Sequence, residues 1–297
     1  MFIHFPMHFV PSRFRHIISP LLVPALFAIA FFAGQTAAHF LRRPSGHTVS
    51  APVIACGSLP PAFDSGSIPV SAVGNWGLGF PSPGQTPVGN ASADTLKNFD
   101  AFYVGDTSKP VIYLTFDAGY ENGNVEKIAD ALDAHGAHGS FFILENLIRR
   151  NPELVQRLHD GGHAVCNHTC RHHDLTKVSR EEFERELRGL EEQYTALTGD
   201  ELTRCYRPPE GRFTEQNLDW ATELGYKTIF WSYAYADWDN DKQPDPEKSI
   251  EKILAHTHPG MIILLHPTSA TNATIMDTLL NRWEEMGYSF RSVGELE

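Results

Sequence analysis

From residue 111 onward, short apolar runs alternate with longer segments in which apolar residues recur every three or four positions. The short runs are typical of strands buried on both faces, and the longer segments are typical of helices that cover a sheet. We predict seven strands, at residues 111–116, 139–144, 163–166, 203–206, 227–231, 261–265 and 288–292. Strict alternation of strand and helix argues for an α/β fold with a parallel sheet, and seven such units favour a barrel over an open sheet.

Capping signals mark the starts of predicted helices. Asn151 precedes Pro152, and Ser179 stands three residues before Glu182, as in a capping box. The longest predicted helix follows Ser179 and ends at Gly199. Its apolar stripe consists of Phe183, Leu187, Leu190, Tyr194 and Leu197.

Residues 1–43 have the order of an export signal. Four of the 24 basic residues and none of the 36 acidic residues lie here. Arg13 and Arg15 precede an apolar run over 17–33, and small residues follow as far as Ala38. This order is typical of a secretory signal, but the run is also near the lower length limit for a spanning helix. We therefore expect an exported protein of the cell envelope, either secreted after cleavage near Ala38 or anchored in the membrane.

Residues 44–95 are rich in Pro, Gly, Ser and Ala, a composition that buries too little apolar area to repay ordering. We predict a linker here, with Trp76 and Phe80 docking on a folded domain over residues 96–297.

The formal net charge is -12, so a phosphate backbone would be repelled and nucleic-acid binding is disfavoured.

The four cysteines are too few for a disulfide scaffold and lack the paired spacing of a structural zinc site. Cys170 and Cys205 lie near the ends of strands that we expect to be neighbours. A disulfide between them and a pair of buried free thiols remain alternatives. Cys166 is expected to pack as a small hydrophobic side chain.

Polar residues follow five predicted strands, at the edge where parallel α/β folds collect their reactive groups. They are Asp117, His168, Arg207, Asp237 and His266. Arg207 begins a segment stiffened by two prolines and could hold Asp117 ionised as a base. The alternative for Asp117 is a turn-forming role before Gly119.

Two further features support a site at this edge. His168 and His172 are four residues apart, a spacing that lets two imidazoles face one cation, although solvated loop histidines are the alternative. Asp237 could orient His266, with the Trp238 indole as a wall beside them; core packing of Trp238 is equally compatible with the sequence.

These residues occur in five short motifs that, as a set, resemble those of the polysaccharide deacetylases with a NodB homology domain, the family 4 carbohydrate esterases. In chain order the motifs are Thr115-Phe116-Asp117, His168-Thr169-Cys170-Arg171-His172, Arg207-Pro208-Pro209-Glu210-Gly211, Asp237-Trp238 and Leu264-Leu265-His266. The likeness covers residues 76–296. The string from Tyr113 to Gly123 is similar to that of the delta-lactam-biosynthetic de-N-acetylases, the PdaA-type subgroup.

The resemblance implies a distorted (β/α) barrel that hydrolyses an acetamide with a general base and a general acid. By this likeness Asp117 is the base, His266 is the acid, and Arg207 and Asp237 orient them. The backbone N–H of Glu210 would help to hold the oxyanion.

The resemblance also implies a divalent metal, with zinc as the expected ion, held by His168 and His172. Most of the family has an aspartate as a third ligand where this chain has Ala118. The PdaA-type subgroup also lacks this aspartate and has an amide or a small residue there. Metal binding is therefore expected to be weaker or differently completed, with Glu121 or water as candidates. Trp238 and Leu264 are the implied substrate contacts.

The implied function is removal of the N-acetyl group from N-acetylmuramic acid of peptidoglycan, on the route to the muramic delta-lactam of the spore cortex. Two alternatives remain: a deacetylase of N-acetylglucosamine polymers, and a catalytically silent glycan-binding module. The expected partner is a peptidoglycan glycan strand, with membrane contact through the N-terminal segment if that segment is uncleaved, and the protein is expected to be a monomer.

Overall fold

The computed structural model describes residues 74–297. The predicted export signal of residues 1–43 lies outside this part of the chain, as do Cys56 and the predicted linker up to residue 73. None of the helices between residues 74 and 297 combines the length and the apolar composition needed to cross a bilayer.

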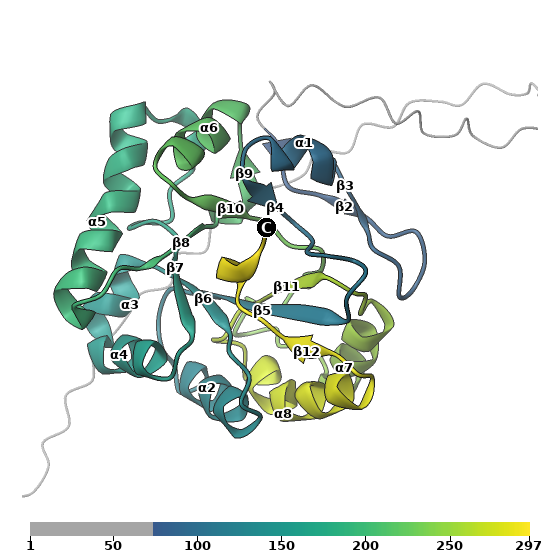
Figure 1. Cartoon of the computed structure of the whole chain (residues 1–297). Helices are drawn as coiled ribbons and strands as arrows, with labels where there is room; N and C mark the ends of the chain where they lie inside the picture. The colour runs from purple at the N-terminus through teal and green to yellow at the C-terminus, as the bar shows by residue number, and fades with distance from the viewer. Residues whose placement is uncertain (1–73) are drawn as a thin grey trace, which may run out of the picture. The chain divides into compact units, whose positions relative to one another are not determined.

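A parallel sheet with the order β11-β5-β6-β7-β8-β10-β4 forms the centre of the domain (Figure 1). Its strands are β4 (Ala101–Phe102), β5 (Val111–Ala118), β6 (Ser140–Ile143), β7 (Ala164–Asn167), β8 (Thr203–Tyr206), β10 (Lys227–Ile229) and β11 (Met261–Leu265). The last strand, β12 (Ser289–Phe290), pairs only with the first two residues of β5. The short strand β4 is an edge strand that the sequence pattern did not predict.

The sheet curls because the segment after β10 pairs with β11. Tyr233 and Ile263 form a parallel bridge, supported by a hydrogen bond from Leu264 N to Tyr233 O at 2.9 Å and one from Ser232 N to Ile262 O at 2.8 Å. These contacts bring the two edges of the sheet together over a short stretch. The predicted distorted (β/α) barrel of about seven parallel strands is confirmed.

Side chains of β5 alternate between two apolar layers. Ile112, Leu114 and Phe116 belong to the large cluster shared with the helices, whereas Val111 and Tyr113 belong to a cluster built from strand residues inside the barrel. Because successive residues of a strand point to opposite faces, Thr115 and Asp117 continue the inner face. The inner face therefore becomes polar toward the carboxyl end of β5.

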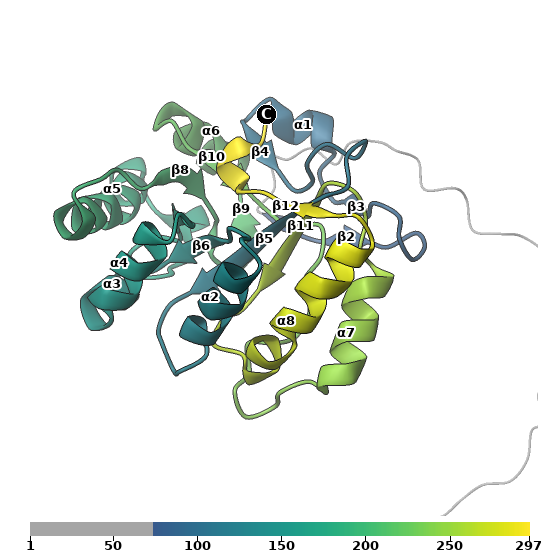
Figure 2. The same cartoon turned by 60° about the horizontal axis from the view of Figure 1, so that its bottom comes forward.

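The helices lie outside the strands (Figure 1). Their bounds are α2 (Val125–Ala134), α3 (Glu145–Arg150), α4 (Pro152–Asp160), α5 (Arg180–Thr198), α6 (Glu215–Glu223), α7 (Pro246–Ala255) and α8 (Ala270–Glu285). Figure 2 shows α2, α8 and α7 side by side on one flank of the sheet. Single 3-10 turns occur at Leu175–Lys177, Pro209–Gly211 and Val293–Glu295.

Helix α5 shows how the predicted signals act. The Ser179 hydroxyl accepts the backbone N–H of Glu182, which satisfies one of the unpaired donors of the first turn. The helix ends at Gly199, whose φ of 85° is a left-handed conformation that glycine adopts at little cost. The predicted start and end of this helix are confirmed.

Residues 74–95 fold against the domain, so the predicted docking of Trp76 is observed, whereas the strands formed here were not predicted. The segment forms β1 (Gly74–Asn75), β2 (Leu78–Gly79), β3 (Val88–Gly89) and the start of α1 (Ala93–Lys97). Trp76 is only 7% exposed, stacks on Phe230, and donates its indole N–H to Trp231 O at 2.8 Å. One large aromatic side chain thus supplies the apolar burial that the segment's composition lacks.

Cys166, Cys170 and Cys205 are free thiols. Of the two alternatives for Cys170 and Cys205, the structure has the free thiols and not the disulfide. The neighbour of Cys205 inside the barrel is instead Cys166, and burial raises the pKa of the Cys166 thiol, with a further contribution from its contact with Cys205.

Candidate active site

An aspartate and an arginine meet at the carboxyl end of the barrel. Arg207, directly after β8, donates from Nη1 to Oδ1 of Asp117 at 2.7 Å. The guanidinium is fully buried, lies over the Phe142 ring at 4.1 Å, and also donates from Nε to Ile229 O at 3.0 Å and from Nη2 to Thr115 Oγ1 at 2.9 Å. These contacts hold the guanidinium in one orientation, and the guanidinium in turn fixes Oδ1 of Asp117.

Asp117 is held ionised. Burial alone would raise the pKa of its carboxyl, but the charges of Arg207, His168 and His266 together outweigh burial, and the pKa lies below its ordinary value. An ionised carboxylate at the mouth of the barrel can accept a proton, so the geometry suits a general base.

His168 faces the second oxygen of Asp117. Its Nδ1 contacts the Arg207 carbonyl oxygen at 2.9 Å, and because a carbonyl only accepts, Nδ1 carries the proton. Burial lowers the pKa of His168 to about 4, against the opposing charge of Asp117, so the ring is neutral near pH 7 and Nε2 presents a lone pair. The Nε2 atom lies 3.4 Å from Asp117 Oδ2. Two acceptors facing each other in this way are well suited to share a cation.

His172 is brought beside His168 by a tight turn. Thr169 and His172 both have left-handed backbones, with φ of 75° and 58°, and the His172 N–H donates to Thr169 Oγ1 at 2.9 Å. The two imidazole centroids are 4.8 Å apart. His172 is exposed, so its ring is reachable from solvent.

The donor set fits a divalent metal through two imidazoles. Nitrogen ligands of neutral histidine suit zinc, which usually takes about three protein ligands in catalytic sites. Ala118 is fully buried within the apolar cluster and offers no ligand atom. Within residues 74–297 no three or more His, Cys, Asp or Glu side chains gather as a ready metal site. His168 and His172 would thus hold an ion that other donors complete.

A second acid–base pair lies on the same rim. Nδ1 of His266, after β11, is 2.7 Å from Asp237 Oδ1, and the His266 backbone N–H donates to Asp237 Oδ2 at 2.9 Å. Burial would lower the pKa of His266, but the hydrogen bond and charge of Asp237 outweigh it, and the pKa is raised. A protonated imidazole with a fixed ring suits a general acid.

The remaining predicted residues surround this rim. Trp238 is 59% exposed with its ring 6.0 Å from that of His266, so the indole is a surface wall and does not pack in the core. Leu264 is 5% exposed, which leaves little of it for a substrate to touch. Glu210 has a left-handed backbone, with φ of 55°, in the turn after Arg207. For a residue other than glycine this is a strained conformation of the kind found at functional sites.

Thr115 is a site residue that the sequence analysis missed. Its hydroxyl donates to Ile263 O at 2.6 Å and accepts from Arg207, which ties β5 to β11 behind the ion pair. A signal was present, because Thr115 is a polar residue two positions before Asp117 on an otherwise apolar strand.

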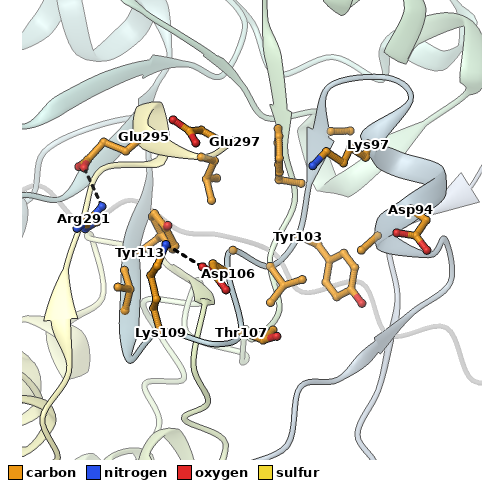
Figure 3. A pocket seen from close by; sticks show the side chains of 17 residues that line it. Asp94, Lys97, Tyr103, Asp106, Thr107, Lys109, Tyr113, Arg291, Glu295 and Glu297 are labelled. Carbon is orange, nitrogen blue, oxygen red and sulfur yellow. Dashed lines mark ion pairs between the residues drawn. The ribbon is translucent and has the colours of Figure 1, made fainter.

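A cavity of about 510 Å³ lies at the opposite end of the barrel, near the starts of β4 and β5 (Figure 3). Its charged side chains include two ion pairs, Lys109 with Asp106 and Arg291 with Glu295. It contains none of the residues of the two acid–base pairs. The predicted site residues lie instead at the carboxyl ends of the strands, the edge where barrels of this kind carry their reactive groups.

Fold and site together define a parallel α/β barrel with an Asp–Arg pair, a His–Asp pair and two adjacent histidines at one rim. The chain belongs to the polysaccharide deacetylase family, whose model matches residues 104–229. This confirms the resemblance carried by the five motifs.

Similar proteins extend the match over most of the domain. The chain is 36% identical over 223 residues to the peptidoglycan-N-acetylmuramic acid deacetylase PdaA of Bacillus subtilis, covering 75% of this chain and 85% of PdaA. It is 39% identical to an uncharacterised 30.6 kDa protein of Geobacillus stearothermophilus, over 75% of this chain and 84% of that protein. The solved structure of Bacillus subtilis PdaA, described as a family 4 carbohydrate esterase, aligns with a TM-score of 0.73, covering 77% of this chain and 98% of the other.

Proposed function

We propose that this protein hydrolyses the N-acetyl group of N-acetylmuramic acid residues in peptidoglycan. The observation that carries the proposal is the meeting, at one rim, of the Asp117–Arg207 pair with the His266–Asp237 pair. One pair suits a base and the other suits an acid, which is the combination that amide hydrolysis requires. The similarity to PdaA, named for this substrate, supports the choice of sugar.

In the proposed reaction Asp117 takes a proton from water as the water oxygen bonds to the acetamide carbonyl carbon. His266 then gives the proton on Nε2 to the amide nitrogen as the C–N bond breaks, which yields acetate and a free amine. Arg207 keeps Asp117 oriented, and Asp237 keeps the other proton of His266 on Nδ1. The backbone N–H of Glu210 is the candidate donor to the oxyanion.

A divalent cation, with zinc as the expected ion, is part of the proposal. When bound, it would polarise the acetamide carbonyl and lower the pKa of water. His168 and His172 would hold it. The neutral state of His168 and its lone pair facing Asp117 support this role.

The place of action is a proposal that rests on the sequence. The export-type order of residues 1–43 supports action in the cell envelope, by a secreted or membrane-anchored protein. The PdaA-type motif supports a place on the route to the muramic delta-lactam of the spore cortex.

The test uses the full-length chain with peptide-stripped peptidoglycan and added Zn²⁺ or Co²⁺, and measures free acetate. We expect release from this substrate and much less from chitooligosaccharides; the reverse order would transfer the proposal to N-acetylglucosamine polymers. The control is Asp117→Asn, which should release acetate about 10²- to 10⁴-fold more slowly. Glycan binding without acetate release at any metal concentration would instead support the silent binding module and overturn the proposal.

A further inference from the structure

Asn272 bridges both members of the proposed acid pair. It is the third residue of α8 and is fully buried. Its side-chain amide donates to Asp237 Oδ2 at 2.7 Å and to the His266 carbonyl oxygen at 3.0 Å. One amide group therefore uses both of its hydrogens to connect the aspartate with the backbone that carries the imidazole.

The orientation of this amide is determined by its neighbours. Its NH₂ group faces two acceptors, so a reversed amide would place its oxygen against the Asp237 carboxylate and the His266 carbonyl. On the other side, the Tyr235 hydroxyl donates to Asn272 Oδ1. The Asn272 backbone is held as well, because its N–H donates to Ser269 Oγ at 3.2 Å in the first turn of the helix.

Asn272 leaves Asp237 little freedom. Asp237 Oδ2 accepts from both Asn272 and the His266 backbone, while Oδ1 accepts, among the described residues, only from His266 Nδ1. Asp237 is buried, so losing a donor would leave a carboxylate oxygen under-satisfied and free the carboxylate to rotate. Rotation would break the contact that assigns the proton to Nδ1.

We infer that Asn272, oriented by Tyr235, is a positioning residue that holds Asp237 against Nδ1 of His266 and thereby leaves Nε2 as the nitrogen that gives up the proton. The effect of Asn272 on turnover rests on the proposed function, whereas its effect on the tautomer of His266 is independent of that function. Three charged groups shift the pKa of His266: Asp237, Asp117 and Arg207. In the described part of the chain the Tyr235 hydroxyl forms its hydrogen bond with Asn272 and with none of these three.

The chain offers a matched pair of tyrosines for the test. Tyr235 and Tyr233 are two residues apart and both buried, but within residues 74–297 the Tyr233 hydroxyl has no hydrogen-bond partner. Tyr235→Phe removes the hydroxyl that orients Asn272, while Tyr233→Phe removes a hydroxyl that forms no hydrogen bond within the described residues. Asn272→Ala and the double variant with Tyr235→Phe complete the set. Each full-length protein is assayed for kcat and KM and for the ¹⁵N shifts of His266.

We expect Asn272→Ala to lower kcat about 10- to 100-fold with KM little changed, because general acid catalysis contributes about 10²- to 10⁴-fold in all. Tyr235→Phe should lower kcat by a smaller factor, have no further effect in the Asn272→Ala background, and shift the neutral His266 ring from Nδ1–H toward a mixture of tautomers. Tyr233→Phe should match the wild type.

Unchanged kcat and an unchanged His266 tautomer in Tyr235→Phe and in Asn272→Ala would overturn the inference. Equal losses in Tyr233→Phe and Tyr235→Phe would also overturn it, because the loss would then reflect packing. If the wild-type protein releases no acetate, the proposed function fails, and the tautomer comparison alone decides the role of Asn272.

Discussion

Asp117 and Arg207 are 90 positions apart in the chain, yet Arg207 Nη1 donates to Asp117 Oδ1 at 2.7 Å inside the barrel mouth. The arginine is buried among backbone carbonyls and an aromatic ring, so it cannot move to follow another partner. The carboxylate is consequently ionised and aimed before any substrate arrives, which is the preorganisation that catalysis by a base requires.

Replacement of Asp117 by asparagine should remove turnover and spare binding. Asparagine keeps the size of the side chain but cannot take a proton from water, so kcat for acetate release should fall about 10²- to 10⁴-fold. Glycan affinity, measured by titration calorimetry, should stay within a few-fold of the wild type. Wild-type rates in Asp117→Asn would exclude this residue as the base.

The pH profile of kcat/KM should be bell-shaped. We expect the acid limb to follow Asp117, whose pKa is lowered, with activity present above that pKa. We expect the alkaline limb to follow His266, whose pKa is raised, with activity lost as pH rises through that pKa. In Asp237→Asn the hydrogen bond to the carboxylate and the larger of the two charges that raise the pKa of His266 are gone, so burial is opposed only by the charge of Asp117 and the pKa of His266 should fall. The alkaline limb should then move to lower pH, and an unmoved limb would assign it to another group.

Metal removal should silence the enzyme reversibly. A chelator is expected to stop acetate release, and Zn²⁺ or Co²⁺ is expected to restore it. His172→Ala removes one of the two proposed imidazole ligands from the exposed side of the site, so the metal concentration for half-maximal rate should rise about 10-fold or more. His173→Ala, at the neighbouring exposed residue, is the control and should keep the wild-type metal dependence. Full activity in metal-free buffer would contradict the metal assignment.

A histidine far from the site should give the stability of the fold a pH dependence. His135, at the end of α2, lies 3.1 Å from Asp277 and 3.0 Å from Glu284, both on α8. Burial would lower its pKa, but the two carboxylates raise it above the ordinary 6.5. Since the folded pKa is raised, the stabilisation is complete below about pH 6.5 and is lost as pH rises through the folded pKa.

His135→Gln should therefore lower the free energy of unfolding in acid and have less effect in alkali. Urea unfolding at about pH 5.5 and about pH 8.5 measures this difference. His138→Gln serves as the control, because His138 is exposed and forms no ion pair within residues 74–297. A His135→Gln effect that is equal at both pH values would show that packing, not charge, joins α2 to α8 here.

The central strands and the long helices were predictable because their signals are local. The apolar run of β5 and the cap residues of α5 act within a few positions, so the pattern alone located them. Strand β4 escaped prediction because it has two residues and pairs only through its neighbour β10. The docking of Trp76 was predicted, but residues 74–95 were still assigned to the linker, because composition does not reveal the two-residue strands β1, β2 and β3 that form there.

The candidate site was predictable in its membership and less so in its connections. Asp117 and His266 each follow an apolar strand, and parallel strands deliver such residues to one edge. Asn272 was missed, because an asparagine in the first turn of a helix gives no sign that its amide faces Asp237 across 35 positions. The pairing considered for Cys170 and Cys205 is not formed, because Cys170 packs against the cluster shared with the helices, whereas Cys205 lies inside the barrel beside Cys166.

By itself, the order of apolar and polar residues determined the alternation of strands and helices, the shared edge of the polar residues and, through five motifs, the family. Tertiary structure decided which atoms meet: which nitrogen of His168 bears the proton, that Arg207 has no freedom, and that Trp238 is a surface wall. The reason is physical, since burial patterns repeat over a few residues of sequence, whereas hydrogen bonds and pKa shifts depend on distances between side chains that only the packed barrel sets.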